Sequence, residues 1–224
     1  MSKELILKNV RLAWWQGFKA KAFAGTRDDG SANEPRYSGR YYIEPKSANA
    51  KLIDAAILQV ANEAWEKKAA QILSVIRTDK QKFCYFESTW CNGEGDPYDG
   101  AEGLFHLNSG QAETKGAPLV IGPTGMKGMN LPAIDKDGRG WTPADSAGMQ
   151  FPILTAKDGR PYSGCFVNVK LNCWSQDNSS GKAVRFSILT VQFAGHGDAF
   201  GGGAPATAEG MESTEDGIAA DDLA

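Results

Sequence analysis

One stretch near the carboxyl end interleaves aromatic rings with amides and a lysine. Residues 162–174 read YSGCFVNVKLNCW and alternate between two faces, as a half-buried strand does. The apolar face would consist of Cys165, Val167, Val169, Leu171 and Cys173. The opposite face would carry Phe166, Asn168, Lys170, Asn172 and Trp174. If that face is open to solvent, its rings can stack unpaired bases and its lysine can neutralise phosphate.

The amino-terminal third repeats this mixture of rings and cations on two further predicted strands. In ELILKNVRLAWW (4–15), strict alternation places Ile6, Val10, Leu12 and Trp14 inward and Arg11 and Trp15 outward. In RYSGRYYIE (36–44), it places Tyr37, Tyr41 and Ile43 inward and Arg36, Arg40 and Tyr42 outward. Gly39 within the second strand predicts a bulge or a sharp bend.

These faces give a set of candidate nucleic-acid contacts. We predict base stacking by Trp15, Tyr42, Phe166 and Trp174, and phosphate contacts by Arg11, Arg36, Arg40 and Lys170. Lys19 and Lys21 in the loop 16–35, and Lys127 in the glycine-rich stretch 122–130, are expected to add positive charge. An alternative is that the long helix or a loop covers Phe166 and Trp174. A strand register wrong by one residue would also exchange the two faces.

The elements that must position these residues are mostly strands. Further strands are predicted over 82–90, 104–109 and 118–122, and a hairpin over 176–182 leads to a return strand over 183–195. A helix is predicted from about 47 to 73, capped by Ser47, because apolar residues recur at helical spacing. Its apolar stripe is Ile53, Ala56, Ile57, Val60, Ala61, Ala64, Trp65, Ala69 and Ile72. The fold class is therefore mainly β with one long helix, as an OB-fold-like antiparallel barrel, closed or partly open, with insertions.

Charge is distributed unevenly along the chain. The net charge is −3, yet residues 201–224 hold six acids and no base, and residues 1–51 hold ten basic and five acidic residues. We therefore expect a folded domain over 1–200 and a disordered acidic tail over 201–224. The tail acids are Glu209, Glu212, Glu215, Asp216, Asp221 and Asp222. A basic body and a tethered polyanion indicate an anionic partner and an internal competitor for it.

Several classes of protein are disfavoured. Neither of the two histidines lies in a zinc-protease motif, no phosphate-binding loop of the Walker type occurs, and no cofactor is predicted. A zinc site formed by Cys84, Cys91 and His106 is conceivable, although the spacing matches no common zinc finger, and the cysteines are expected to be reduced. The first residues lack the pattern of a secretory signal and no apolar run could span a membrane, so a cytoplasmic protein is expected.

With these residues in view, the chain resembles phage-encoded single-stranded-DNA-binding proteins with an OB-fold. The resemblance is carried by residues 162–202, by LKNVRLAW (7–14) and by the acidic carboxyl terminus. It implies a barrel that binds single-stranded DNA without sequence preference, in replication or recombination in the cytoplasm of an infected host. It also implies that the tail contacts other replication proteins. Comparable tails often end in an aromatic residue, whereas this one ends in Leu223 and Ala224, so the resemblance carries over the electrostatic role of the tail.

Two other classes of function stay open at this point. Aromatic platforms on sheets also bind sugars, so a carbohydrate-binding or virion structural protein is an alternative. A metal-dependent nuclease could use the acids Glu94, Asp96, Asp99 and Glu102. A homodimer formed through strand edges is also compatible with the sequence.

Overall fold

The computed structural model describes residues 2–25, 30–87 and 101–200. The six tail acids lie outside these ranges, as do Cys91 and the predicted acidic ligands Glu94, Asp96 and Asp99. The predictions that depend on those residues therefore have no structural outcome.

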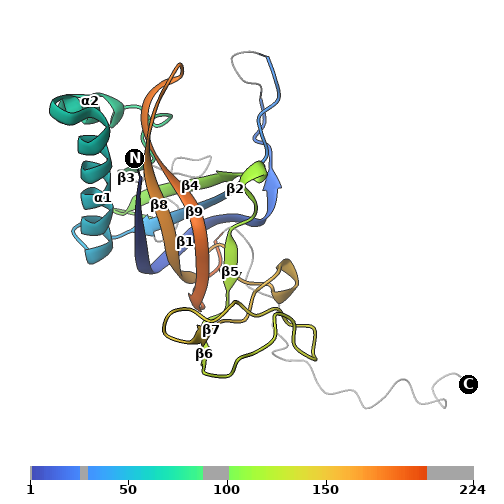
Figure 1. Ribbon diagram of the computed structural model, residues 1–224. Coiled ribbons are helices and arrows are strands. Elements are labelled where there is room, and N and C mark those ends of the chain that lie inside the picture. The colour runs from blue at the N-terminus through green and yellow to red at the C-terminus, as the bar shows by residue number, and fades with distance from the viewer. Residues whose placement is uncertain (1, 26–29, 88–100, 201–224) are drawn as a thin grey trace, which may run out of the picture.

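A seven-stranded sheet forms the body of the protein (Figure 1). The strand order is β3-β4-β2-β1-β8-β9-β5, and all neighbouring pairs are antiparallel except β5 and β9, which are parallel. The strands are β1 (Ser2–Lys21), β2 (Arg36–Ile43), β3 (Tyr85–Glu87), β4 (Phe105–Ala112), β5 (Leu119–Ile121), β8 (Phe166–Asn178) and β9 (Gly181–Gly195). A separate two-stranded sheet, β6 (Met126–Lys127) with β7 (Met149–Gln150), lies within the connection between β5 and β8.

The large sheet curls toward a barrel without closing. Its two edges are β3 and β5, but β9 also lies against β4. Just before β3, Phe83 forms a parallel bridge with Val184, and the Val184 amide donates to the carbonyl of Lys82 at 3.0 Å. The mainly β, OB-like architecture is thus confirmed in its partly open form, with the parallel strand β5 as the departure from an antiparallel barrel.

One long helical segment packs on this sheet, as predicted. It consists of α1 (Ala48–Trp65), the single 3₁₀ turn Glu66–Lys68 and α2 (Ala69–Ile76). Ser47 caps it, because its hydroxyl accepts a hydrogen bond from the amide of Ala50 at 3.1 Å. The helix is interrupted at Glu66, whose φ of 47° is incompatible with a continuous α-helix. The apolar stripe from Ile53 onward joins the same core as the sheet.

The two faces of β8 are distributed as the sequence predicts. The five residues of the apolar face, Cys165 to Cys173 in alternation, are all fully buried. Phe166, Asn168, Lys170, Asn172 and Trp174 are all half-buried on the other face. Cys84, Cys165 and Cys173 are free thiols. Among the helices of the described residues, none combines the length and the apolar character that a bilayer crossing requires.

The inward and outward faces of β1 differ from the prediction because its pairing is irregular at two points. The register with β8 shifts between Leu7 and Val10, where Asn9 adopts a φ of 50°. Leu5 and Leu7 therefore point inward before this bulge, and Ile6, predicted to be inward, is 52% exposed. The register with β2 shifts between Leu12 and Trp14. This second irregularity leaves Trp14 47% exposed, whereas Trp15 packs against the core.

Gly39 does not mark a bulge in the β2–β4 ladder, which stays in register from Arg36 to Ile43. A Cβ atom at this position would lie 2.6 Å from the Tyr41 hydroxyl oxygen. Glycine is therefore needed here because the buried Tyr41 side chain approaches the backbone closely. A close approach of this kind is a further reason for a glycine within a strand, and the sequence alone does not distinguish it from a bulge.

Candidate nucleic-acid interface

A cleft of about 580 Å³ opens where β4 runs past the short strand β3 and faces the β8–β9 hairpin. Among the residues that the structure describes, the lining contains three arginines, Arg36, Arg40 and Arg185, and no acid. Four aromatic rings also line the cleft, those of Trp14, Phe23 and Trp174 and that of the buried Phe186. In Figure 1 the tip of the β8–β9 hairpin and the end of β1 both extend toward the top of the view. A concave, cationic and aromatic surface of this kind suits a polyanion with exposed bases.

Arg40 is a partly buried cation of the cleft that a neighbouring strand holds in position. Its Nε donates a hydrogen bond of 2.6 Å to the side-chain oxygen of Asn108, on the neighbouring strand. Burial lowers the pKa of Arg40 to about 10, and the residue therefore remains charged at neutral pH. A partly desolvated guanidinium binds an anion more strongly than one in open water, because solvent screens it less.

Neighbouring side chains fix the position of Trp174 but leave part of its ring face uncovered. Its indole Nε1 donates to the hydroxyl of Ser187 on β9 at 3.0 Å, and Arg185 is its cross-strand partner. The ammonium group of Lys115 lies 5.9 Å from the ring centroid. The ring is only half-buried, so one large aromatic surface is presented at the cleft beside two cations.

The floor of the cleft is neutral. The buried Ser109 hydroxyl donates to the carbonyl of Gly39 at 3.2 Å, and burial raises the pKa of the Cys84 thiol to about 12. Cys84 is therefore a packed, protonated side chain under the cations rather than a reactive thiolate.

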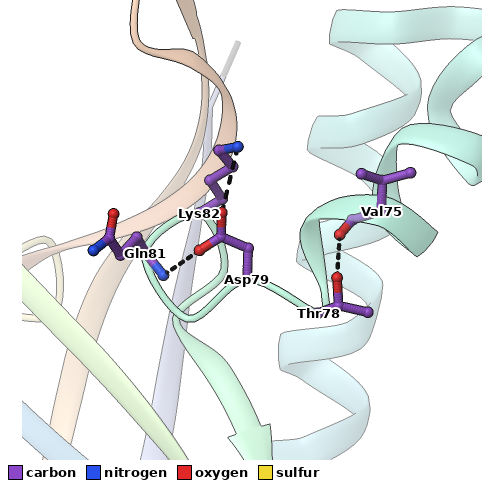
Figure 2. Close-up of polar contacts among 5 residues, drawn as sticks. All are labelled: Val75, Thr78, Asp79, Gln81 and Lys82. Atoms are coloured by element: carbon purple, nitrogen blue, oxygen red, sulfur yellow. Dashed lines mark hydrogen bonds and ion pairs between the residues drawn. The ribbon is translucent and has the colours of Figure 1, made fainter.

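The turn after α2 positions the segment that carries Cys84 (Figure 2). Thr78 donates to the carbonyl of Val75 at 2.8 Å, and Asp79 accepts the amide of Gln81 at 2.8 Å. Asp79 also forms an ion pair of 3.3 Å with Lys82. The hydrogen bond from Gln81 is the main cause that lowers the pKa of Asp79, followed by its contacts with Lys82. This turn directs residues 82–84 onto β9, where Phe83 bridges to Val184 across the open side of the sheet.

Three of the predicted contacts, Arg36, Arg40 and Trp174, line the cleft together. Lys21 is exposed and is the cross-strand partner of Arg36, so it adds a cation at the same border. The structure thus brings together four of the predicted residues from β1, β2 and β8. Whether they bind nucleic acid stays a prediction.

Four other predicted residues lie outside the cleft lining. Trp15 packs against the core, with its ring over Gly17 and edge-on to Phe18 at 5.8 Å, so its predicted outward position is wrong. Lys170 forms an ion pair of 2.6 Å with Glu4 on β1. Lys19 and Lys127 are exposed, but neither lines the cleft.

The remaining three, Arg11, Tyr42 and Phe166, lie beneath residues 196–200, which follow β9. Tyr42 is only 5% exposed because Phe200, Leu104 and Ala101 pack around it, so its predicted outward exposure is wrong. The guanidinium carbon of Arg11 lies 4.2 Å from the centroid of the Phe200 ring.

Trp14, Arg185 and Phe23 also line the cleft but are not among the predicted contacts. Strict alternation places Trp14 in the core because it takes no account of the irregular pairing between Leu12 and Trp14. Arg185 could have been found, because the apolar neighbours Val184 and Phe186 place it on the outer face of the return strand. Phe23 follows β1 and is 56% exposed, and no periodicity marks it.

The part of the chain that the structure describes brings together no group of three or more potential metal ligands. His106 is buried beside Phe86, with ring centroids 4.0 Å apart, and Cys84 lines the cleft instead.

Comparisons with known proteins point to one kind of protein. A family profile described as the ssDNA-binding protein of Enterobacter phage Enc34 matches residues 3–222. A protein called p50, from Acyrthosiphon pisum secondary endosymbiont phage 1, is 34% identical over 206 residues, which cover 91% of this chain and 89% of that protein.

Two solved structures share the fold. The single-stranded DNA-binding protein from bacteriophage Enc34 in complex with ssDNA superposes with a TM-score of 0.56 at 19% identity, covering 88% of this chain and 89% of that one. A second structure of that protein gives a TM-score of 0.54 at 17% identity, covering 92% and 88%.

Proposed function

We propose a function for this chain from its family: it belongs to the phage single-stranded-DNA-binding proteins of the Enterobacter phage Enc34 type. It binds single-stranded DNA without sequence preference in the cytoplasm of the infected host, and it does so without catalysis. The observation that carries this proposal is the cleft, in which three arginines and four aromatic rings meet and no acid lines the surface among the described residues.

In the proposed mechanism, bases stack on rings while guanidinium groups neutralise the phosphates between them. Trp14 and Trp174 offer ring faces at the cleft, and stacking of this kind tolerates any base because every base has a π-face. Arg36, Arg40 and Arg185 supply the charge, and Asn108 holds Arg40 in position. The salt dependence of binding separates this proposal from sugar recognition, which should be nearly insensitive to salt.

Replacing Arg36 with alanine should weaken binding to a polythymidine oligonucleotide and should also change its dependence on salt. If Arg36 contacts one phosphate, the slope of log K against log salt becomes less steep by about 0.7. Fluorescence anisotropy over a series of salt concentrations measures this slope.

The matched control is Lys136→Ala, which removes one cation from a residue that does not line the cleft. We expect this control to keep the original slope. An unchanged slope in Arg36→Ala would show that Arg36 makes no phosphate contact.

The acidic tail has a role in the same proposal. Its six carboxylates compete with DNA for the cations of the cleft, and DNA then frees the tail to contact replication or recombination proteins. The tail is joined directly to residues 196–200, which pack on the body of the protein, so its effective concentration near that body is high.

Removing the residues after Gly203 should tighten DNA binding several-fold at low salt and have little effect at high salt, because salt screens the competing charges. Anisotropy titrations of the full and the truncated chain measure this difference. A full-length chain in which the six acids are changed to their amides separates charge from length, and it should behave like the truncation. Equal affinities for all three chains at low salt would contradict the competition.

A further inference from the structure

Residues 196–200, which we call the clasp, turn back over the outer face of the sheet after β9 ends. The Phe200 amide donates to the carbonyl of Ser163 at 3.1 Å, and Arg11 Nη2 donates to the carbonyl of Asp198 at 3.1 Å. The Tyr162 hydroxyl donates to the carbonyl of Gly197 at 3.0 Å. The Tyr162 hydroxyl also accepts a hydrogen bond from the Gly197 amide at 3.3 Å and lies 3.1 Å from His196 Nδ1. These contacts hold the clasp against the barrel outside any strand pairing.

Two glycines allow the clasp backbone to lie close to the backbone of the barrel. A Cβ atom on Gly164 would lie 2.0 Å from the carbonyl oxygen of Asp198. A Cβ atom on Gly197 would lie 2.4 Å from the carbonyl oxygen of Gly164 and 3.1 Å from the Phe166 ring. Two glycines that face each other across the contact therefore allow the clasp to lie directly on the barrel.

Phe200 occupies a slot made of one cation and one aromatic ring. The Arg11 guanidinium lies over its ring at 4.2 Å, and the Tyr42 ring meets it edge-on, with centroids 5.6 Å apart and planes at 87°. A flat ring on a guanidinium plane is also the way in which proteins hold an unpaired base. The slot thus has the chemistry of a nucleotide site while a side chain of the same protein fills it.

This slot continues the cleft along one face of β2. Arg36, Ser38 and Arg40 line the cleft at every second position, and Tyr42 is the next residue on that face. Successive residues on one face of a strand lie about 7 Å apart, so a DNA strand that leaves the cleft past Arg40 arrives at Tyr42 and Phe200.

We propose that Arg11 and Tyr42 form a second single-stranded-DNA subsite, that Phe200 covers it in the free protein, and that a nucleobase displaces the clasp. This inference rests on the proposed function and adds to it a cover that acts by packing, independently of the charge of the tail. The clasp lies outside the strands, and Asp198 and Ala199 in its middle are exposed, so its release leaves the core intact. Displacement also moves the point from which residues 201–224 leave the barrel, which couples DNA binding to the position of the tail.

The test is Phe200→Ala in the full-length chain, with Phe200→Trp as the variant that keeps a ring in the slot. If the clasp is closed most of the time, its removal raises the affinity for a long polythymidine oligonucleotide by about three- to tenfold. An oligonucleotide of about four nucleotides, which fills the cleft alone, should gain nothing. The gain should persist at high salt, unlike the gain from truncating the tail, because packing rather than charge is removed. Phe200→Trp should bind like the unaltered protein.

A second measurement uses the unaltered protein and does not depend on how the variant folds. The Phe200 amide should be protected from hydrogen exchange in the free protein, and it should lose that protection when a long oligonucleotide saturates the protein. If DNA binds with full occupancy while the Phe200 amide stays protected, or if Phe200→Ala leaves the affinity unchanged or lowers it, the clasp proposal is overturned and DNA binding stands. If no oligonucleotide binds at low salt, the proposed function fails as well.

Discussion

Replacing Trp174 with alanine is expected to weaken binding to single-stranded DNA by about 5- to 150-fold, which corresponds to the 1–3 kcal/mol that a stacked base contributes. The expectation follows from the position of the ring, which is half-buried at the cleft between Arg185 and Lys115. The hydrogen bond from Trp174 to Ser187 fixes its plane before DNA arrives, so little conformational entropy is lost on binding. Anisotropy of a labelled polythymidine oligonucleotide measures the effect without depending on tryptophan emission.

Two further variants separate stacking from structural damage. Trp174→Phe keeps an aromatic face and loses the bond to Ser187, so it should retain most of the affinity. Trp141→Phe changes a buried tryptophan that does not line the cleft, and it should bind like the unaltered protein. If Trp174→Ala binds as tightly as both controls while its circular dichroism is unchanged, the cleft is not where bases stack.

The faces of β8 were predictable because its pairing with β9 is continuous near Trp174 and its apolar positions alternate without a break. The long helix was predictable for the same reason, since its stripe keeps one period from Ile53 through Trp65. In both elements local periodicity and burial agree. The predicted roles of Arg36, Arg40 and Trp174 depend on those elements, and these residues do meet at one cleft.

The faces of β1 could not be predicted because the strand serves two neighbours that impose different registers. Its first half pairs with β8 and its second half with β2, and an irregularity occurs in each ladder. Each extra residue reverses the faces of everything after it, which is why Trp14 and Trp15 exchange places. The glycines and charges near these points do not reveal where the extra residue lies.

The burial of Tyr42 could not be predicted for a different reason. Its outward parity on β2 was correct, but Phe200, 158 residues later, packs against it. The alternation of apolar and polar residues within a strand cannot reveal a contact with a residue so distant in the sequence. Strand periodicity therefore gives the faces of Arg36, Arg40, Trp174, Arg11 and Tyr42, whereas only the tertiary structure shows that Phe200 lies against Arg11 and Tyr42.

The stability of the fold is expected to fall between about pH 6.5 and pH 4 because of His106. This side chain is fully buried on β4. Burial, together with the nearby positive charges of Arg40 and Lys80, lowers its pKa to about 4. The unfolded chain has the ordinary value of about 6.5, so within this window the unfolded state binds a proton that the folded state does not. Folding stability is therefore complete above pH 6.5 and decreases as the pH falls toward 4.

The size of the effect follows from the difference between the two pKa values. At about 1.4 kcal/mol for each unit of pKa, His106 accounts for a loss of about 2–3 kcal/mol in the free energy of unfolding by about pH 4.5. Urea denaturation at pH 7 and at pH 4.5 measures this loss. His106→Gln keeps a neutral polar side chain, and it should lower stability at pH 7 yet show a smaller loss on acidification.

Carboxylates do not account for the same window. Hydrogen bonds from neighbouring residues lower the pKa values of Asp79, Asp135 and Asp158. The stability that these carboxylates contribute is therefore lost only as the pH falls below the ordinary pKa of aspartate. A difference between the two proteins at pH 4.5 therefore belongs to His106. Parallel pH dependences for the unaltered protein and His106→Gln would mean that folding does not lower the pKa of His106. That result requires that the side chain is less buried, and that Arg40 and Lys80 lie farther from it, than the packing of β2, β3 and β4 places them.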